Sequence, residues 1–204
     1  MKKRKRNLKS KKDFSFKQEY KESWGYLKKS QNFIYIIIAI FLLFALLGFF
    51  IPIPESLSNQ IFEFIRELLE QTKNMGQGEL TSFIFFNNFK ASFMGMIFGA
   101  LFGVFSIILA LVNGYLIGFV ALIAIQEAGF SVLWKLIPHG IFELPAVFIS
   151  LGLGLKLGMF VFEKEKFSAF KDFLLNSLRV FLLIVVPLLI IAAIIEGALI
   201  AFAA

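Results

Sequence analysis

The sequence predicts an all-α fold: a polytopic membrane helical bundle of about five transmembrane helices, with an outer amphipathic helix. Of 204 residues, 58% are hydrophobic and only 17% are charged, and 28 are Phe. A soluble domain of this size is about one quarter charged and cannot bury so much apolar surface in one core. The same composition excludes a disordered chain, because disorder requires low hydrophobicity and high charge.

Positive charge is concentrated in the first 32 residues, which hold 12 Lys and Arg against three acidic residues. A basic segment directly before an apolar span is typical of the cytoplasmic side of a membrane protein and can contact anionic lipid, so we expect no nucleic-acid binding. Apolar side chains recur within it at helical spacing: Phe16, Tyr20, Trp24 and Leu27. They predict a helix lying in the headgroup layer, whereas residues 1–12 are better described as a partly disordered tail.

The chain divides into a basic cytoplasmic arm, residues 1–32, and a single transmembrane domain, residues 33–204. Apolar segments long enough to cross a hydrocarbon core of about 30 Å define the spans. The predicted spans are 33–51, 89–112, 115–134, 138–162 and 173–202. Placing the N-terminus in the cytoplasm puts most basic residues on that side, so the C-terminus is expected outside the cell.

The connections between the spans carry their own signals. Residues 55–71 have an apolar face opposite an acidic one, which predicts an amphipathic helix on the outer surface. The pair Asn113–Gly114 predicts a tight turn after span two. Span three holds only 11 apolar residues before Gln126. It either continues to Trp134 with Glu127 buried against protein, or forms a half-helix followed by a re-entrant segment.

Glycines at steps of four residues predict close packing between helices. Gly95, Gly99 and Gly103 are expected on one face of span two, and Gly154 and Gly158 on span four. Small residues at this spacing let two membrane helices approach closely. We therefore expect these faces to contact other helices rather than lipid.

Polar side chains within the spans are the candidates for a functional site, because polar groups are costly inside a membrane. His139 and Glu143 are four residues apart and share a helix face where span four begins. The predicted topology places most candidates in the outer half of the bilayer, as a pocket for a ligand, a proton or a partner. Alternatively, Lys90 pairs with Glu143 and the cluster only holds the helices together. The candidate set is Pro138, His139, Gly140, Glu143, Asn87, Asn88, Asn113, Gly114, Lys90, Glu127 and Glu196.

Signatures of catalysis and metal binding are missing from the sequence. The chain has no Cys and one His, whereas a catalytic zinc usually takes three protein ligands. The HExxH, GxSxG and P-loop motifs do not occur. We therefore expect no metal, no cofactor and no enzymatic activity.

Several of these polar and glycine positions together resemble the stage II sporulation protein M family. The matching elements are Phe86-Asn87-Asn88, then Asn113-Gly114 with Gly118, then Pro138-His139-Gly140 with Glu143, Gly152 and Gly154. The resemblance covers about residues 83–158 and implies a five-span integral membrane protein. In endospore-forming bacteria it implies the scaffold of a complex with a membrane-anchored peptidoglycan-degrading enzyme and its lytic partner. The Lys-rich arm lies outside the shared pattern.

We expect an integral membrane scaffold that assembles cell-envelope-remodelling partners through its outer polar face and the 55–71 helix. The expected partners are anionic lipid headgroups at the basic arm, membrane-anchored envelope enzymes or other membrane proteins, and a second copy of the chain. The alternative is a small-molecule transporter or permease subunit with an outward-facing polar site. The interrupted span three and the kinked span four favour it, although no inverted repeat is visible.

Overall fold

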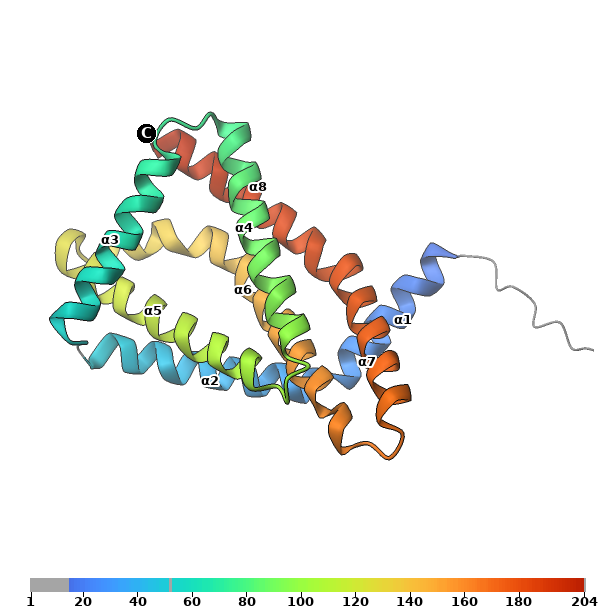
Figure 1. Ribbon diagram of the computed structural model, residues 1–204. Helices are drawn as coiled ribbons and strands as arrows, with labels where there is room; N and C mark the ends of the chain where they lie inside the picture. The colour runs from blue at the N-terminus through green and yellow to red at the C-terminus, as the bar shows by residue number, and fades with distance from the viewer. Residues whose placement is uncertain (1–14, 52, 204) are drawn as a thin grey trace, which may run out of the picture.

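In the part of the chain that it describes, residues 15–51 and 53–203, the computed structural model is built of helices (Figure 1). Side chains are described for the same residues except 69, 132–139 and 200–203. The all-α fold is thus confirmed, whereas the expected tail at residues 1–12 lies outside the described residues. The helices are α1 Phe16–Lys29, α2 Gln31–Phe50, α3 Glu55–Thr72, α4 Gln77–Phe98, α5 Val104–Ala128, α6 Leu133–Gly158, α7 Lys166–Val180 and α8 Val186–Ala203.

Among the described residues, four helical segments are long and apolar enough to cross a membrane. They are Gln31–Phe50, Val104–Ala128, Gly140–Phe162 and Lys166–Leu199. This confirms a polytopic helical membrane protein. The helix α4, which carries Glu79 and Lys90, is not among the four, so the fifth span stays a prediction. The first span and the amphipathic helix α3 begin and end within two residues of the expected positions.

The prediction of a turn at Asn113–Gly114 is wrong, because α5 passes through this pair without interruption. The chain reverses at residues 99–103 instead, where Phe102 has a φ of 55° and Gly103 a φ of 72°. Glycine adopts this left-handed conformation without steric cost, which suits it to end the turn. The Asn113 amide donates to the Leu109 carbonyl oxygen at 2.8 Å, so its polar group is satisfied within the helix.

Span three is therefore neither short nor broken. The helix α5 has 25 residues and ends at Ala128, and Gly129, with a φ of 74°, follows it. Glu127 is exposed, so the alternative in which this residue is buried against protein is wrong. The next helix, α6, begins at Leu133 rather than at Pro138 and bends along its length (Figure 1).

Glycines bring two pairs of helices into backbone contact. A Cβ atom on Gly114 would meet the backbone of Phe41, and one on Gly118 would overlap the backbone of Ala45. Because these contacts advance together along both chains, α2 and α5 run parallel. In the same way a Cβ atom on Gly99 would overlap the backbone of Gly154, which fixes the end of α4 against α6. The predicted close approach of helices at the glycines is confirmed. Gly99 and Gly103, however, lie in the turn after α4, which ends at Phe98.

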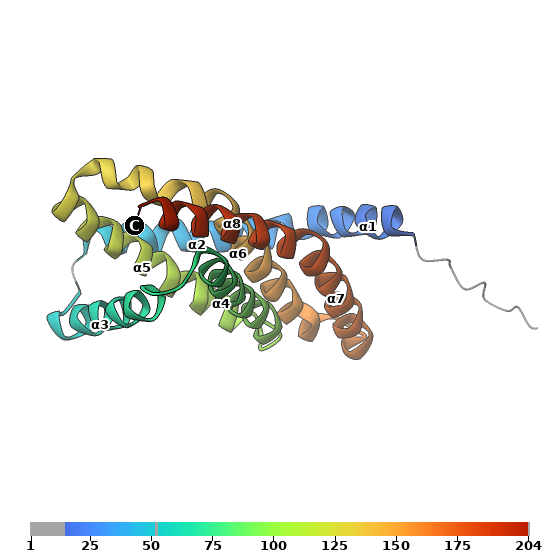
Figure 2. The same cartoon turned by 90° about the horizontal axis from the view of Figure 1, so that it is seen from above.

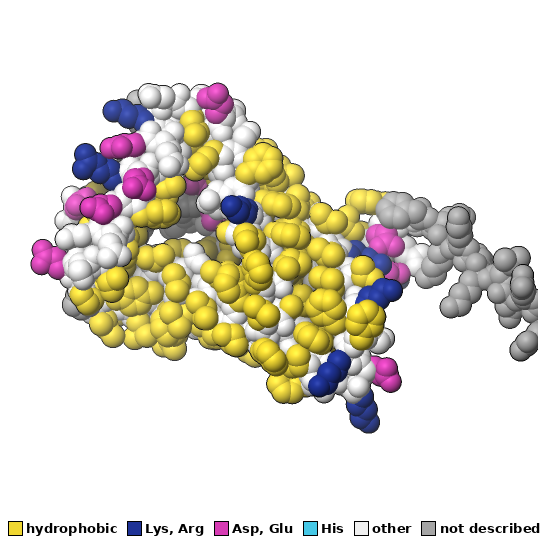
Figure 3. Space-filling model, in the orientation of Figure 1, with side chains coloured by type: hydrophobic (Ala, Val, Ile, Leu, Met, Phe, Trp, Pro, Cys, Tyr) yellow, Lys and Arg dark blue, Asp and Glu magenta, His cyan; other side chains and the backbone are white. Residues whose placement is uncertain are grey.

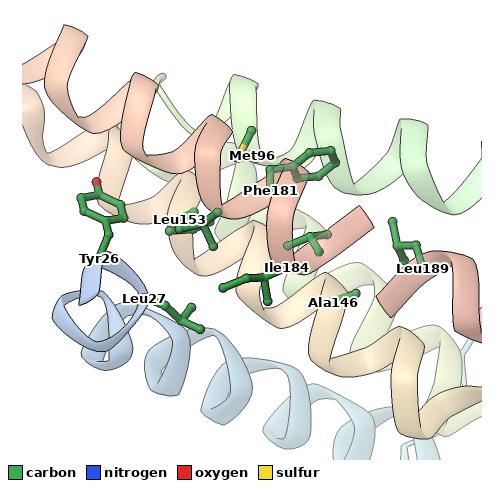
Figure 4. Packing of buried hydrophobic residues seen from close by; sticks show 10 residues of the cluster. Tyr26, Leu27, Met96, Ala146, Leu153, Phe181, Ile184 and Leu189 are labelled. Carbon is green, nitrogen blue, oxygen red and sulfur yellow. The ribbon is translucent and has the colours of Figure 1, made fainter. Parts of the chain in front are cut away.

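The largest hydrophobic cluster lies between α4, α6 and α8 and reaches α1 through Tyr26 and Leu27 (Figure 4). Phe181 is fully buried at its centre, and its ring lies 5.4 Å from the rings of both Phe89 and Phe93. Between α7 and α8 the chain forms a π-helical turn over Phe181–Val185, shortly before Pro187. A proline lacks the N–H that the helix would use, and such a turn accommodates the missing bond.

The molecule has two polar ends separated by an apolar middle (Figure 3). The α1 end holds α1, α7 and the connection between α6 and α7, whereas the α3 end holds α3, the start of α4 and the end of α8 (Figures 1 and 2). The middle surface is covered mainly by hydrophobic side chains, while charged side chains gather at the two ends (Figure 3). This distribution suits helices that cross a membrane with both ends in water.

Candidate functional site

The structure does not gather those predicted site residues whose side chains it describes into one pocket. Asn87 and Lys90 are exposed on α4, Asn88 beside them is partly buried, and Asn113 is exposed on α5. Gly114, by contrast, is buried against α2. The side chains of Pro138 and His139 lie outside the described residues. Gly140 has room for a Cβ atom, since the nearest neighbour would be Leu144 at 3.7 Å.

Two predicted residues do approach one another across helices. Glu143 on α6 and Glu196 on α8 are both partly buried, and their carboxyl groups are near enough to repel each other. The alternative in which Lys90 pairs with Glu143 is wrong, since no ion pair joins these two described residues. Of the predicted outer cluster, Glu143 and Glu196 are the described residues that interact across two helices.

A second polar cluster, at the α1 end, was not predicted. Its centre is Arg179 near the end of α7, whose guanidinium contacts two carboxylates of α1. Nε lies 2.5 Å from Oε2 of Glu19, and Nη1 lies 3.0 Å from Oε2 of Glu22. Nη1 also donates to Oδ1 of Asn176 at 3.1 Å. A guanidinium presents several donors in a fixed plane, so one arginine can hold two acidic residues of a neighbouring helix.

The same cluster contains a buried lysine. Lys156 on α6 is 8% exposed, and its Nζ donates to Oγ of Ser30 at 3.0 Å. Nζ also lies 3.8 Å from the centre of the Tyr26 ring. An ammonium group is costly to bury alone, and the ring face and the hydroxyl oxygen replace part of its water. Lys156 therefore connects α6 to both α1 and the residue that follows α1.

Tyr26 completes the contact between α1 and α7. Its hydroxyl donates to the carbonyl oxygen of Phe173 at 3.5 Å, and its ring is almost completely buried. Burial disfavours the charged phenolate and raises the pKa of Tyr26 to about 12, with Asp172 adding to the effect and Ser177 opposing it. Tyr26 therefore stays protonated and packed wherever the protein is folded at ordinary pH.

Sequence reasoning missed this cluster because its partners are far apart in the chain. In the sequence, Arg179 is a single charge near the start of an apolar segment, and Glu19 and Glu22 are acidic residues of a basic arm. Spacing shows that Glu19 and Glu22 share a helix face, but it does not show which distant residue that face contacts. No group of three His, Cys, Asp or Glu that could hold a metal ion occurs among the described residues.

At the opposite end, α3 packs lightly on the bundle. Its Phe62 ring lies 6.1 Å from the Phe119 ring of α5. Leu57 and Phe64 remain 49% and 60% exposed. The polar face carries exposed acidic residues, and Figure 3 shows them gathered beside a hollow in the surface. They are Glu55, Glu63, Glu67 and Glu70.

Comparison with known proteins gives one match. The family model described as stage II sporulation protein M matches residues 37–199, most of the chain. The matched segment includes α3, Arg179 and every residue of the predicted site, but not α1. No curated protein and no solved structure matches the chain.

Proposed function

Because the chain belongs to the stage II sporulation protein M family, we propose that this multi-pass membrane protein is a scaffold that assembles cell-envelope-remodelling partners, such as peptidoglycan-degrading enzymes. The observation that carries the proposal is α3, an 18-residue amphipathic helix that lies across one end of the molecule with few contacts to the bundle. A partner can bind such a helix without first breaking an existing interface.

The distribution of charge supports a definite orientation for this scaffold. The exposed basic residues of the described α1 end are Lys17, Lys21, Lys28, Lys29, Lys164, Lys166 and Lys171. At the α3 end, acidic residues outnumber Arg66 and Lys73. Positively charged segments stay in the cytoplasm, so we place the α1 end inside and the α3 end outside the cell. The α3 helix then faces the compartment in which cell-wall enzymes act.

The proposed contact surface is the polar face of α3 together with its exposed apolar edge. The side chains of Glu63, Glu67 and Glu70 provide negative charge, and Arg66 contacts Glu70 at 3.3 Å. Leu57 supplies apolar area at the border of this face. Charges at the rim of such a surface guide association, while the apolar side chains contribute binding free energy.

Site-specific photocrosslinking in native membranes tests this function. A photoreactive amino acid in place of Glu67 should capture membrane-anchored envelope enzymes, because this residue lies on the exposed face of α3. The same amino acid in place of Leu42, which is 54% exposed on α2, is the matched control and should capture lipid. Equal capture of those enzymes from both positions, or from neither, would contradict the scaffold role.

A transporter or permease subunit is the second candidate function. The observation that favours it is the pair Glu143 and Glu196, two partly buried carboxyl groups on the packed helices α6 and α8 that interact electrostatically. Acidic residues inside a helical bundle commonly line ion or proton pathways. Capture of an ATPase or a solute-binding protein at position 67 would support this candidate, and the variant Glu143→Gln should then abolish transport while leaving capture intact.

A further inference from the structure

The helix α1 has three faces, each with a different environment. Its inward face packs on the bundle through the buried residues Ser23, Tyr26 and Leu27. The acidic residues Glu19 and Glu22 flank this face and contact Arg179. The charges that would repel an anionic surface are thus paired with a neighbouring helix.

The second face of α1 is aromatic and exposed. Phe16 is 63% exposed, and Tyr20 and Trp24 are each 43% exposed. The rings of Tyr20 and Trp24 contact edge to face, with their centres 6.3 Å apart. Aromatic side chains with a polar atom are favoured at the boundary between headgroups and hydrocarbon. Leu27, expected in the same stripe, is instead buried at its border.

The third face of α1 is basic. Lys17, Lys21 and Lys28 follow one another at steps of four and seven residues, so they share one side of the helix, and all three are exposed. This row lies next to the aromatic face. A helix with an aromatic face beside a lysine row suits the interface of an anionic membrane.

The start of the first membrane span fixes the depth of α1. The helix ends at Lys29 and α2 begins at Gln31, so only Ser30 separates α1 from a segment that enters the hydrocarbon. Lys156 holds this junction by donating to the Ser30 hydroxyl. The junction keeps α1 within reach of the headgroups.

We propose that α1 is a docked lipid-binding helix that recruits anionic phospholipid headgroups through Lys17, Lys21 and Lys28, with Tyr20 and Trp24 inserted beside them. The ion pairs to Arg179 set the rotation of the helix, so the lysine row and the aromatic face meet the membrane together. A free nucleic acid would use the lysines but leave the aromatic face in water. This inference concerns lipid and does not depend on the scaffold role.

Trp24 reports on its own lipid neighbours, which allows a direct test. The full chain with Trp134→Phe retains Trp24 as its single tryptophan. It is reconstituted in phosphatidylcholine vesicles that contain either brominated phosphatidylglycerol or the same amount of brominated phosphatidylcholine. Quenching of the fluorescence measures which lipid lies against α1. If Trp134→Phe does not fold, the difference in signal between the unmodified chain and Trp24→Phe gives the same quantity.

We expect brominated phosphatidylglycerol to quench Trp24 with a several-fold higher association constant, and added salt to reduce this preference. The combined variant Lys17→Gln, Lys21→Gln and Lys28→Gln should bring the ratio close to one. Its matched control removes the same charge from the neighbouring connection and the first turns of α7, and should keep most of the preference. That control is Lys164→Gln, Lys166→Gln and Lys171→Gln.

Three outcomes would overturn the proposal. Equal quenching by the two brominated lipids in the parent protein would show that α1 does not select anionic headgroups. An equal loss in the two lysine variants would mean that net charge, rather than the lysine row of α1, attracts the lipid. Retention of duplex DNA that depends on Lys17, Lys21 and Lys28, without a lipid preference, would assign the row to nucleic acid and also overturn it.

Discussion

The two amphipathic helices at opposite ends of the molecule, α1 and α3, are attached to it in different ways (Figures 1 and 2). Two ion pairs to Arg179 and the buried ring of Tyr26 hold α1. Among the described side chains of α3, Phe62 contacts the bundle through the ring of Phe119. The chain itself therefore fixes the position of α1, whereas something outside the chain can set the position of α3.

This difference separates two kinds of surface. A helix that the chain holds firmly presents one fixed surface, which suits a lipid layer of constant composition. A lightly held helix costs little to move and suits docking of another protein. The α3 helix also lies within the segment that matches the family model, and α1 lies before it.

The largest expected effect concerns the glycines that join the helices. A Cβ atom on Gly99 would overlap the backbone of Gly154, which cannot move aside as a flexible side chain can. We expect Gly99→Ala to lower the free energy of unfolding by about 3 kcal/mol or more, measured by thermal unfolding in detergent. Gly78→Ala, at the α3 end, is the control, because a Cβ atom there meets nothing within 4 Å. Similar stability of the two variants would contradict the tight contact.

The next effect compares the arginines of the two ends. Arg179→Met should destabilise the protein by about 1–3 kcal/mol, because it leaves the partly buried carboxylate of Glu19 and the more exposed one of Glu22 without their guanidinium partner. Arg66→Met, its matched control in α3, should cost about 0.5 kcal/mol or less, since the side chains of Arg66 and Glu70 are 81% and 68% exposed. Equal losses from the two substitutions would mean that α1 is held no more firmly than α3.

A smaller effect depends on pH and on Tyr26. The pKa of Tyr26 is raised from 10.0 to about 12, so folding favours the protonated phenol. The stability that this provides is complete below about pH 10 and is lost as the pH rises to about 12. Tyr26→Phe should remove this component, so the difference in stability between the variant and the parent should change over that interval. A difference that stays constant would show that Tyr26 is not buried against α7.

The smallest effect is expected from α3. Phe62→Ala should lower the free energy of unfolding by less than about 1 kcal/mol, because much of this ring is already exposed. Phe181→Ala, in the fully buried cluster, should cost about 3–5 kcal/mol. Thermal unfolding of both variants would show how unevenly stability is distributed. A loss from Phe62→Ala close to that from Phe181→Ala would mean that α3 belongs to the core.

Local patterns predicted much of the fold but little of the site. The apolar run of α2 and the two-sided pattern of α3 depend on neighbouring residues, and both helices begin and end close to where they were expected. The pair Asn113–Gly114 misled because an asparagine can satisfy its amide within a helix, as it does with Leu109. The true reversal depends on Gly103 and its contact with α6, which is not a local property.

The ion pairs of Arg179 show even more clearly that local sequence patterns do not predict contacts between distant residues. Their partners Glu19 and Glu22 precede Arg179 by most of the chain, so the pairing follows from how α7 and α1 pack rather than from any motif. The predicted outer cluster depended on how the spans pack against one another, which their individual sequences do not specify. Of its described members, Glu143 and Glu196 interact electrostatically because α6 and α8 pack together.

Hydrogen exchange in the purified full chain tests the central difference between the two ends most directly. In detergent, without partner proteins, the amides of α1, Phe16–Lys29, should exchange slowly, because the contacts to α7 and Lys156 must open first. The amides of α3, Glu55–Thr72, should exchange many times faster. Arg179→Met should raise the exchange of α1 toward that of α3. Equal protection of the two helices in the parent protein would contradict this account.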